Sequence, residues 1–221
     1  MNYKTIVITG SNGSTAKGLI RYFSNHFNNV IGISRDPHEI FSEKNVFIYK
    51  ANMLNRSESF NISKHIIEKH QAIDVWINCI GGFSMGNSID EDHENWNSMY
   101  NVNFTTCLNG CQAAIHYMKQ QTDGHIINIG SEAVLNGFEN AAAYLISKSS
   151  VHALTKLIDL EMKKFNIACN AILPGIIDTP QNREAMPNED YTKWQTPEQI
   201  AKTIHRTLES KESGNLVSVN L

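Results

Sequence analysis

The first segment of the chain restricts the fold most, because it reads as a strand followed at once by a glycine turn and a helix. Residues 4–9 are Lys-Thr-Ile-Val-Ile-Thr, an apolar, β-branched run suited to a strand covered on both faces. Residues 10–18 are small and polar, and residues 19–23 begin an apolar helix. Exposed amide groups and the helix dipole at such a helix start favour an anion. The segment therefore predicts a phosphate-binding turn at the end of a buried strand.

Apolar runs of the same kind recur along the chain, with helical patterns between them. The predicted strands cover residues 30–34, 46–50, 73–78, 124–130, 167–173 and 216–219. The predicted helices cover residues 57–70, 91–121 and 141–158 and a last segment from residue 197. With 221 residues, of which 41% are hydrophobic, the chain can bury one sizeable core. We therefore expect a single domain spanning residues 1–221.

Three residues near the middle of the chain, Ser131, Tyr144 and Lys148, are candidates for a catalytic group. Tyr144 and Lys148 are four residues apart on a predicted helix, so they share one face. Ser131 lies thirteen residues before Tyr144 and follows a predicted buried strand, where ligands bind in open parallel sheets. Lowering a tyrosine pKa from about 10 to about 7 requires on the order of 4 kcal/mol, whereas an exposed ion pair supplies only about 0–1 kcal/mol. An active phenolate therefore needs a partly dry site and a second positive group besides Lys148.

Ser131, Tyr144 and Lys148 resemble the catalytic set of the short-chain dehydrogenase/reductase family, and the resemblance runs over essentially the whole chain. It implies an α/β, Rossmann-like, doubly wound parallel sheet with helices on both faces, and NAD(P)-dependent oxidoreductase activity. Asn103 matches the family asparagine whose helix is locally opened so that a water can link to the lysine. The resemblance therefore implies four catalytic residues: Asn103, Ser131, Tyr144 and Lys148.

The phosphate turn departs from the family pattern Thr-Gly-x-x-x-Gly-x-Gly. Thr9 and Gly10 match, but Ser14 and Ala16 occupy the other two glycine positions. Both residues are small, so close approach of a phosphate to the backbone is still expected, and the Ser14 hydroxyl could add a contact. The resemblance implies that the cofactor is held by Gly10, Ser11, Asn12, Ser14, Thr15, Ala16, Ser34, Arg35, Asn52, Met53, Asn78, Ile80, Gly81, Tyr144, Lys148, Pro174, Gly175, Ile177 and Thr179.

The choice of cofactor depends on the residues after the second predicted strand. An acidic residue there would bind a ribose 2′-hydroxyl and repel a phosphate, but the chain has Ser34-Arg35. A guanidinium fits a phosphate with two hydrogen bonds. Asp36 follows, and it could instead pair with Arg35 or mark a turn before Pro37. The sequence favours NADP(H), with NAD(H) still possible.

Composition excludes several other classes of protein. The formal charge of −3 and pI near 6.3 give no basic footprint for nucleic acid. No run of about 18 apolar residues is present to span a membrane, and the first residues lack the pattern of a signal peptide, so we expect a cytoplasmic protein. Cys107 and Cys111 lie on one predicted helix face with His116 nearby, but no zinc-like ligand spacing accompanies them, so we predict no metal. His125 and His152 are interpreted as structural residues.

The remaining expectations concern partners and substrate. The small and apolar residues of the helix that carries Tyr144 exceed the needs of one face, and the family resemblance implies that this helix packs against its copy in a homodimer or homotetramer. Residues 180–197 turn polar, which is typical of a surface loop, and we expect this loop to cover a small-molecule substrate.

The leading hypothesis is an NADP(H)-dependent oxidoreductase that interconverts a carbonyl and an alcohol, with Tyr144 as general acid or base. Residues 178–187, with Trp194 beyond them, are similar to the tail of dihydropteridine reductase and of some uncharacterised bacterial relatives. A pteridine reductase is therefore one alternative, although the presence of Ser131 and Arg35 counts against it. A protein that binds NADP(H) as a sensor without turnover is the other, suggested by the missing loop glycines.

Overall fold

One seven-stranded sheet organises the protein. The computed structural model describes residues 3–38, 40–210 and 212–219. The strands are all parallel and lie in the order β3-β2-β1-β4-β5-β6-β7, so the strand order reverses between β1 and β4. Their bounds are β1 Thr5–Thr9, β2 Asn29–Ser34, β3 Val46–Lys50, β4 Val75–Asn78, β5 Gly124–Ile129, β6 Ile167–Leu173 and β7 Leu216–Ser218. In such a sheet, ligands bind outside the carboxyl ends of the strands at the point of reversal.

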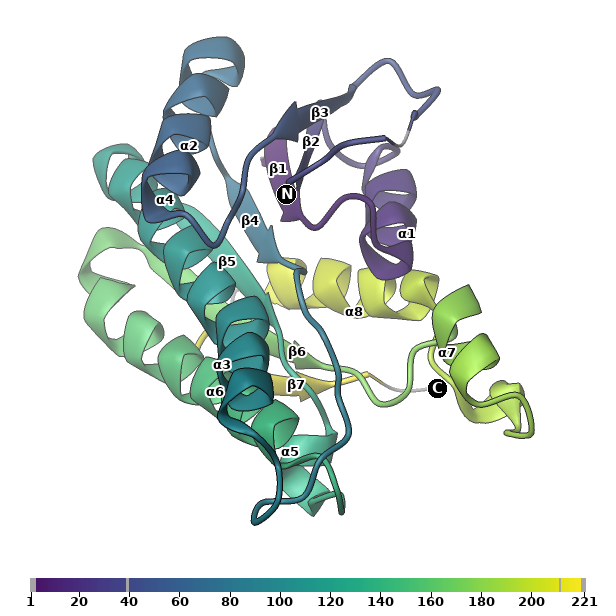
Figure 1. The fold of residues 1–221 in the computed structure, drawn as a ribbon. Helices are drawn as coiled ribbons and strands as arrows, with labels where there is room; N and C mark the ends of the chain where they lie inside the picture. Colours follow the sequence, from purple (N-terminus) through teal and green to yellow (C-terminus); the bar gives the residue numbers. More distant parts are fainter. Residues whose placement is uncertain (1–2, 39, 211, 220–221) are drawn as a thin grey trace.

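Helices cover both faces of this sheet, as Figure 1 shows. On one face α1 (Ser14–Phe23) packs beside α8 (Pro197–Ser210), and both contribute to one hydrophobic core. On the other face α2 (Arg56–His70), α4 (Thr106–Gln121) and α6 (Ala142–Met162) enclose a second core around the buried Trp76. The near-continuous burial of the strands follows from this double covering. The α/β, doubly wound architecture is therefore confirmed.

The long helix expected over residues 91–121 is interrupted. It consists of α3 (His93–Tyr100), one π turn (Asn101–Thr105) and α4. A π turn widens the helix by one residue and is often found at functional sites. This interruption turns Asn103 into the interior, where only 1% of its surface is exposed, although an asparagine in a regular helix would tend to point outward.

The segment after β6 is more ordered than the expected loop. Residues 180–197 contain α7 (Pro180–Ala185) and a single 3₁₀ turn (Tyr191–Lys193). The Thr179 hydroxyl accepts a hydrogen bond from the Asn182 amide (3.2 Å), and Pro180 occupies the first helical position, where its missing N–H costs nothing. Two further short helical pieces that the sequence did not predict are α5 (Ala133–Asn136) and the 3₁₀ turn Lys163–Phe165. Among the described residues, no helix is both long and apolar enough to cross a membrane.

Candidate active site

Ser131 lies just beyond the end of β5, and a buried histidine fixes its backbone. The Ser131 N–H donates to His152 Nε2 at 3.3 Å. Burial, with Lys148 and Lys156 nearby, lowers the pKa of His152 to about 4, so the ring is neutral and can accept this bond. Gly130 leaves space for the ring, because a Cβ atom there would lie only 2.5 Å from Nε2. His152 is thus a structural residue, as the sequence analysis interpreted it, and it positions Ser131.

Tyr144 projects from the first turn of α6 toward Ser131. A hydrogen bond with the Ser131 side chain lowers the pKa of Tyr144, but burial has the larger effect and raises it above its usual value. The tyrosine ring also contacts Phe83 edge to face, with ring centroids 5.0 Å apart. The protein alone therefore brings the two hydroxyls together and keeps the phenol protonated.

Lys148 shares the helix face of Tyr144 but has a different partner. Its ammonium donates to the Ile129 carbonyl at the end of β5, with a nitrogen-to-oxygen distance of 2.8 Å. The side chain is buried, and burial lowers its pKa. Gly81 lies close to it, since a Cβ atom on Gly81 would be 3.3 Å from Nζ. Lys148 thus stands between the ends of β4 and β5.

Asn103 joins this group from the π turn. Its amide nitrogen donates to the Gly82 carbonyl (3.0 Å) and the Ser147 hydroxyl (3.1 Å), and its oxygen accepts from the Gly82 N–H (2.9 Å). The Asn103 oxygen would also lie 3.1 Å from a Cβ atom on Gly81. The structure therefore brings all four predicted catalytic residues to the same end of the sheet.

The phosphate turn has the shape of an anion site. Gly10 has a φ of +78°, which favours glycine, and a Cβ atom there would press on Ile80 at 3.1 Å. The Ser11 hydroxyl and the Asn12 amide oxygen are buried without a hydrogen-bond partner in the described part of the chain. A buried polar atom normally has a partner, so this cradle fits the diphosphate of a dinucleotide. Thr15 and Ala16 follow in the first turn of α1.

Ser14, at the start of α1, has a partner far away in the sequence. Its hydroxyl donates to the Gln181 side-chain oxygen on α7 at 2.9 Å. The hydroxyl expected to reach a phosphate therefore ties α7 to the phosphate turn. Sequence reasoning missed Gln181, because nothing in either segment signals a contact across 167 residues.

The residues expected at the adenosine end lie around the ends of β2 and β3. Ser34 is buried, whereas the Arg35 side chain is exposed and forms no ion pair with Asp36 in the ranges described. Lys50 lies directly beside Ser34 in the strand register and adds a second exposed cation that the sequence analysis did not single out. These two cations suit a 2′-phosphate.

Asn52 and Met53 follow β3. The Asn52 side-chain oxygen accepts from the Leu54 N–H in a local turn (3.1 Å). Met53 is buried, and its carbonyl accepts from Asn109 (2.9 Å). The backbone of this turn is also engaged, since the Asn52 N–H donates to the Glu58 carboxylate (2.9 Å) and the Asn52 carbonyl accepts from the Asn55 N–H (2.9 Å).

Asn78 differs from the other expected cofactor residues, because its side chain is used in the interior. Its oxygen accepts from Trp76 Nε1 at 2.8 Å, and its nitrogen donates to Asn128 Oδ1 at 2.8 Å. Asn78 therefore supports the sheet, and only its backbone can face a cofactor. The neighbouring Ile80 and Gly81 contact the phosphate turn and Lys148, as described above.

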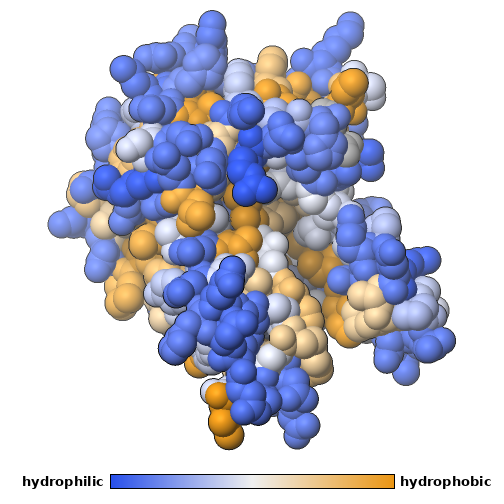
Figure 2. Space-filling model, in the orientation of Figure 1, coloured by the Kyte–Doolittle hydropathy of each residue, from blue (hydrophilic) through white to orange (hydrophobic). Residues whose placement is uncertain are grey.

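The Pro-Gly segment after β6 is held by its own contacts. The Gly175 N–H donates to the Gln195 side chain (2.8 Å), and the Ile177 carbonyl accepts from Asn182 (2.8 Å). Because the Thr179 hydroxyl caps α7, it is already engaged by the protein. Pro174 is buried at the end of β6. The segment leads directly from the sheet edge into α7, which forms the lobe beside a partly hydrophobic hollow in Figure 2.

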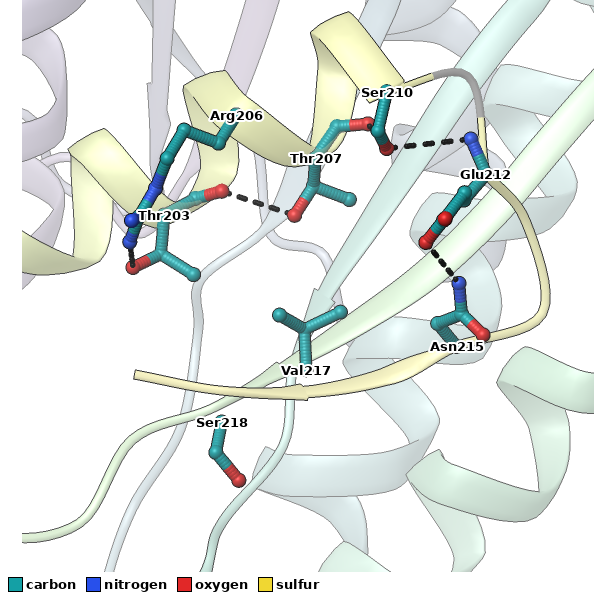
Figure 3. A pocket seen from close by; sticks show the side chains of 8 residues that line it. All are labelled: Thr203, Arg206, Thr207, Ser210, Glu212, Asn215, Val217 and Ser218. Atoms are coloured by element: carbon teal, nitrogen blue, oxygen red, sulfur yellow. Dashed lines mark hydrogen bonds between the residues drawn. The ribbon is translucent and has the colours of Figure 1, made fainter. Parts of the chain in front are cut away.

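A separate pocket of about 220 Å³ lies between α8 and β7 (Figure 3). It contains none of the expected site residues and is lined by Thr203, Arg206, Thr207, Ser210, Glu212, Asn215, Val217 and Ser218. Its polar groups bond to one another, as with Arg206 to Thr203 (3.2 Å) and Asn215 to Glu212 (3.1 Å).

In the described ranges no group of three or more His, Cys, Asp or Glu residues could hold a metal ion. Cys107 and Cys111 instead contact Asn128.

Comparison with known proteins identifies the family of this chain. The family model described as short chain dehydrogenase matches residues 4–190, which is most of the chain. The chain belongs to the short-chain dehydrogenase family. It is an oxidoreductase of this type, and the resemblance noted in the sequence is confirmed.

The sequences of relatives within the family align with this chain over most of its length. A 3beta-hydroxysteroid dehydrogenase of Eggerthella lenta is 30% identical over 191 residues, covering 82% of this chain and 73% of its own. An uncharacterized oxidoreductase of Staphylococcus epidermidis is 26% identical over 182 residues, covering 80% and 79%. Among solved structures, ElxO with NADP bound is 25% identical, with a TM-score of 0.89 and coverage of 98% of this chain and 97% of its own.

Within this short-chain dehydrogenase, the Ser14 contact gives a testable prediction. Ser14→Ala and Gln181→Ala should each weaken NADPH binding by about two- to tenfold, because each removes one hydrogen bond that holds α7 near the phosphate turn. The double variant should be no weaker than either single variant, since both remove the same bond. Fluorescence titration of NADPH measures all three. A loss with Ser14→Ala alone would show that this hydroxyl contacts the phosphate instead.

Proposed function

We propose that the protein is an NADP(H)-dependent oxidoreductase that interconverts a carbonyl and an alcohol on a small molecule. The approach of the Ser131 side chain to the Tyr144 phenol, close enough to lower the pKa of that phenol, carries this proposal. It brings two hydroxyl groups to one point at the carboxyl end of β5, where both can donate to a single carbonyl oxygen. Lys148 and Asn103 lie directly behind them.

Each residue of this group has a distinct task in the reduction. Ser131 and Tyr144 orient the carbonyl by donating hydrogen bonds to its oxygen. The nicotinamide, when bound, supplies the hydride that adds to the carbonyl carbon. Tyr144 gives its proton to the oxygen as the C=O double bond becomes a C–OH single bond. The tyrosine then regains a proton along the path formed by Lys148 and Asn103, and oxidation of the alcohol reverses each step.

Lys148 gains a further hydrogen-bond partner in this proposal. Its ammonium donates to the Ile129 carbonyl in the protein alone, and the lowered pKa reflects its burial. Lys148 would also donate to a ribose hydroxyl of a bound cofactor, since the small Gly81 leaves space beside its ammonium. A positive charge at this point, together with that of an oxidised nicotinamide, favours the phenolate form of Tyr144 and opposes the effect of burial.

The choice of NADP(H) rests on Arg35 and Lys50. Both side chains are exposed at the neighbouring ends of β2 and β3, where the ribose of the adenosine is expected. The related structure of ElxO has NADP bound, which supports the same assignment here. NAD(H) lacks the 2′-phosphate that these cations would bind, so we propose it as the weaker cofactor.

NADPH oxidation measured against a panel of carbonyls, quinones and dihydropterins tests the proposed function. We expect turnover with at least one carbonyl, and turnover lower by a factor of about 10² or more with the Tyr144→Phe variant. Turnover confined to dihydropterins would favour the pteridine alternative. Tight NADPH binding with no turnover of any compound would contradict the proposal and favour a sensor.

A homo-oligomer remains a prediction, and α6 is the surface that we expect to be shared. Its exposed residues include an apolar stripe at helical spacing, formed by Ile146, Ala153, Leu157 and Leu160. Such a stripe can pack against its own copy across a two-fold axis. Sedimentation at micromolar concentration should show a dimer or tetramer, and Leu157→Asp should shift it toward the monomer. Wild-type protein that sediments only near 25 kDa would contradict this prediction.

A further inference from the structure

Two exposed phenylalanines continue the aromatic surface that begins at Tyr144. Phe83 follows β4, and its ring contacts Tyr144 edge to face at 5.0 Å. Phe138 follows α5, and its ring centroid lies 6.5 Å from that of Phe83. The two phenylalanines are 56% and 53% exposed. Exposed aromatic surface that continues directly from a reactive hydroxyl is typical of a ligand-binding surface.

The two loops that carry these rings are tied together by the backbone. The Gly86 N–H donates to the Asn140 carbonyl (2.8 Å), and the Ala142 N–H donates to the Gly86 carbonyl (3.0 Å). Glu91 adds a third link, because its carboxylate accepts from the Ala143 N–H at 3.3 Å. The aromatic surface formed by Phe83 and Phe138 is therefore held in place relative to α6, and little ordering is needed when a ligand binds.

The two loops that carry this surface contain acidic but no basic residues. Residues 79–92 and 131–147 contain acidic side chains, among them Glu132 and Glu139, but no lysine or arginine. Lys148 is buried, and its ammonium donates to the Ile129 carbonyl. Arg183 on α7 pairs with both carboxylate oxygens of Asp178 (2.6 and 2.8 Å), which also lowers the pKa of that carboxyl. A carboxylate or phosphate on a substrate would face the acidic side chains of these two loops and would be repelled.

We infer that the substrate of this site is an uncharged aromatic ketone or aldehyde, or the corresponding alcohol, whose ring packs against Phe83 and Phe138. The inference rests on the proposed function, because it assumes that the carbonyl oxygen lies between Ser131 and Tyr144. From that point the ring extends over Phe83, and Phe138 contacts the far edge of the substrate. The reaction is the reduction already described, so it needs no further reactant.

Three ketones with the same acetyl-phenyl core test the charge requirement. They are acetophenone, methyl 4-acetylbenzoate and the anion 4-acetylbenzoate, of which the methyl ester controls for size. We expect kcat/KM with NADPH to be at least tenfold higher for both neutral compounds than for the anion. Equal or higher kcat/KM for the anion would overturn the inference while leaving the proposed function intact.

Variants of the aromatic surface test the contact. Phe138→Ala should raise KM for acetophenone by about tenfold and leave kcat within a factor of two, since Phe138 does not contact Tyr144. Phe138→Leu keeps an apolar side chain but no ring, so its KM for acetophenone should lie between those of the wild type and Phe138→Ala. Phe165→Ala is the matched control and should not change KM, because this partly exposed ring lies just before β6, at the opposite end of the sheet from Ser131. An unchanged KM in Phe138→Ala would overturn the inference.

A binding measurement separates the two proposals. Ligand-observed NMR titration of NADP⁺-saturated protein measures acetophenone and 4-acetylbenzoate without turnover. Selective binding of acetophenone that is lost in Phe138→Ala supports the aromatic site, even if a failed NADPH assay contradicts the proposed function. Binding of both compounds with equal affinity, or of neither, overturns the inference.

Discussion

Tyr144→Phe is expected to lower kcat by a factor of about 10² or more, because general acid catalysis typically contributes about that much. The variant loses the hydroxyl that bonds to Ser131 but keeps the ring that packs on Phe83. Cofactor binding and folding should therefore be nearly unchanged. NADPH oxidation under saturating substrate measures kcat, and fluorescence titration of NADPH measures binding.

Tyr100→Phe is the matched control for this prediction. Tyr100 is an exposed tyrosine at the end of α3 whose ring packs at a tilt on Phe104, with centroids 4.8 Å apart. Removal of its hydroxyl should leave kcat unchanged. If Tyr144→Phe turned over at the wild-type rate, Tyr144 would not be the acid, and the proposed mechanism would be wrong.

Arg35→Ala is expected to weaken NADPH binding by roughly tenfold to a hundredfold and to leave NADH binding nearly unchanged. A charge-assisted hydrogen bond contributes roughly 1.5–3 kcal/mol, and about 1.4 kcal/mol is a factor of ten in affinity. Arg35 is exposed at the end of β2 and is not engaged by Asp36 in the described ranges, so its guanidinium is available for a 2′-phosphate. Titration of wild type and variant with both reduced cofactors measures the four affinities.

Two further variants sharpen the cofactor test. Lys50→Ala should also weaken NADPH selectively, because Lys50 lies beside Ser34 in the strand register. Arg21→Ala, on the last turn of α1, removes a cation elsewhere and should affect neither cofactor. Equal affinity of the wild type for NADH and NADPH, or an equal loss of both in Arg35→Ala, would remove the claim of NADP(H) preference.

The loss of the loop glycines has a structural consequence that the motif alone does not reveal. Ser14 stands at a position where the family pattern has glycine, and its hydroxyl reaches Gln181 on α7. The substitution therefore introduces a link between the phosphate turn and the segment expected to cover the substrate. The turn still keeps the positive φ of Gly10 and the buried Ser11 hydroxyl without a partner in the described part of the chain.

Short-range features of the sequence determined the order and type of most elements. The β-branched run before Gly10 forms β1, and residues 167–173 form β6 with the predicted bounds. Tyr144 and Lys148 share a face because a helix repeats every 3.6 residues, which is a local property of the backbone. The position of Ser131 after a buried strand likewise followed from the hydrophobic pattern, so the sequence by itself brought the candidate site to the carboxyl edge of the sheet.

Only the tertiary structure decided which groups those side chains meet. The π turn rotates Asn103 inward to Gly82, Lys148 bonds the Ile129 carbonyl, and Phe83 packs against Tyr144. The Asn78 side chain, expected near a cofactor, is instead used by the interior. These contacts join residues distant in the chain, and their free energies depend on packing, burial and the competition between partners. Periodicity and propensity carry no information about that competition, so it became visible only when the elements were packed together.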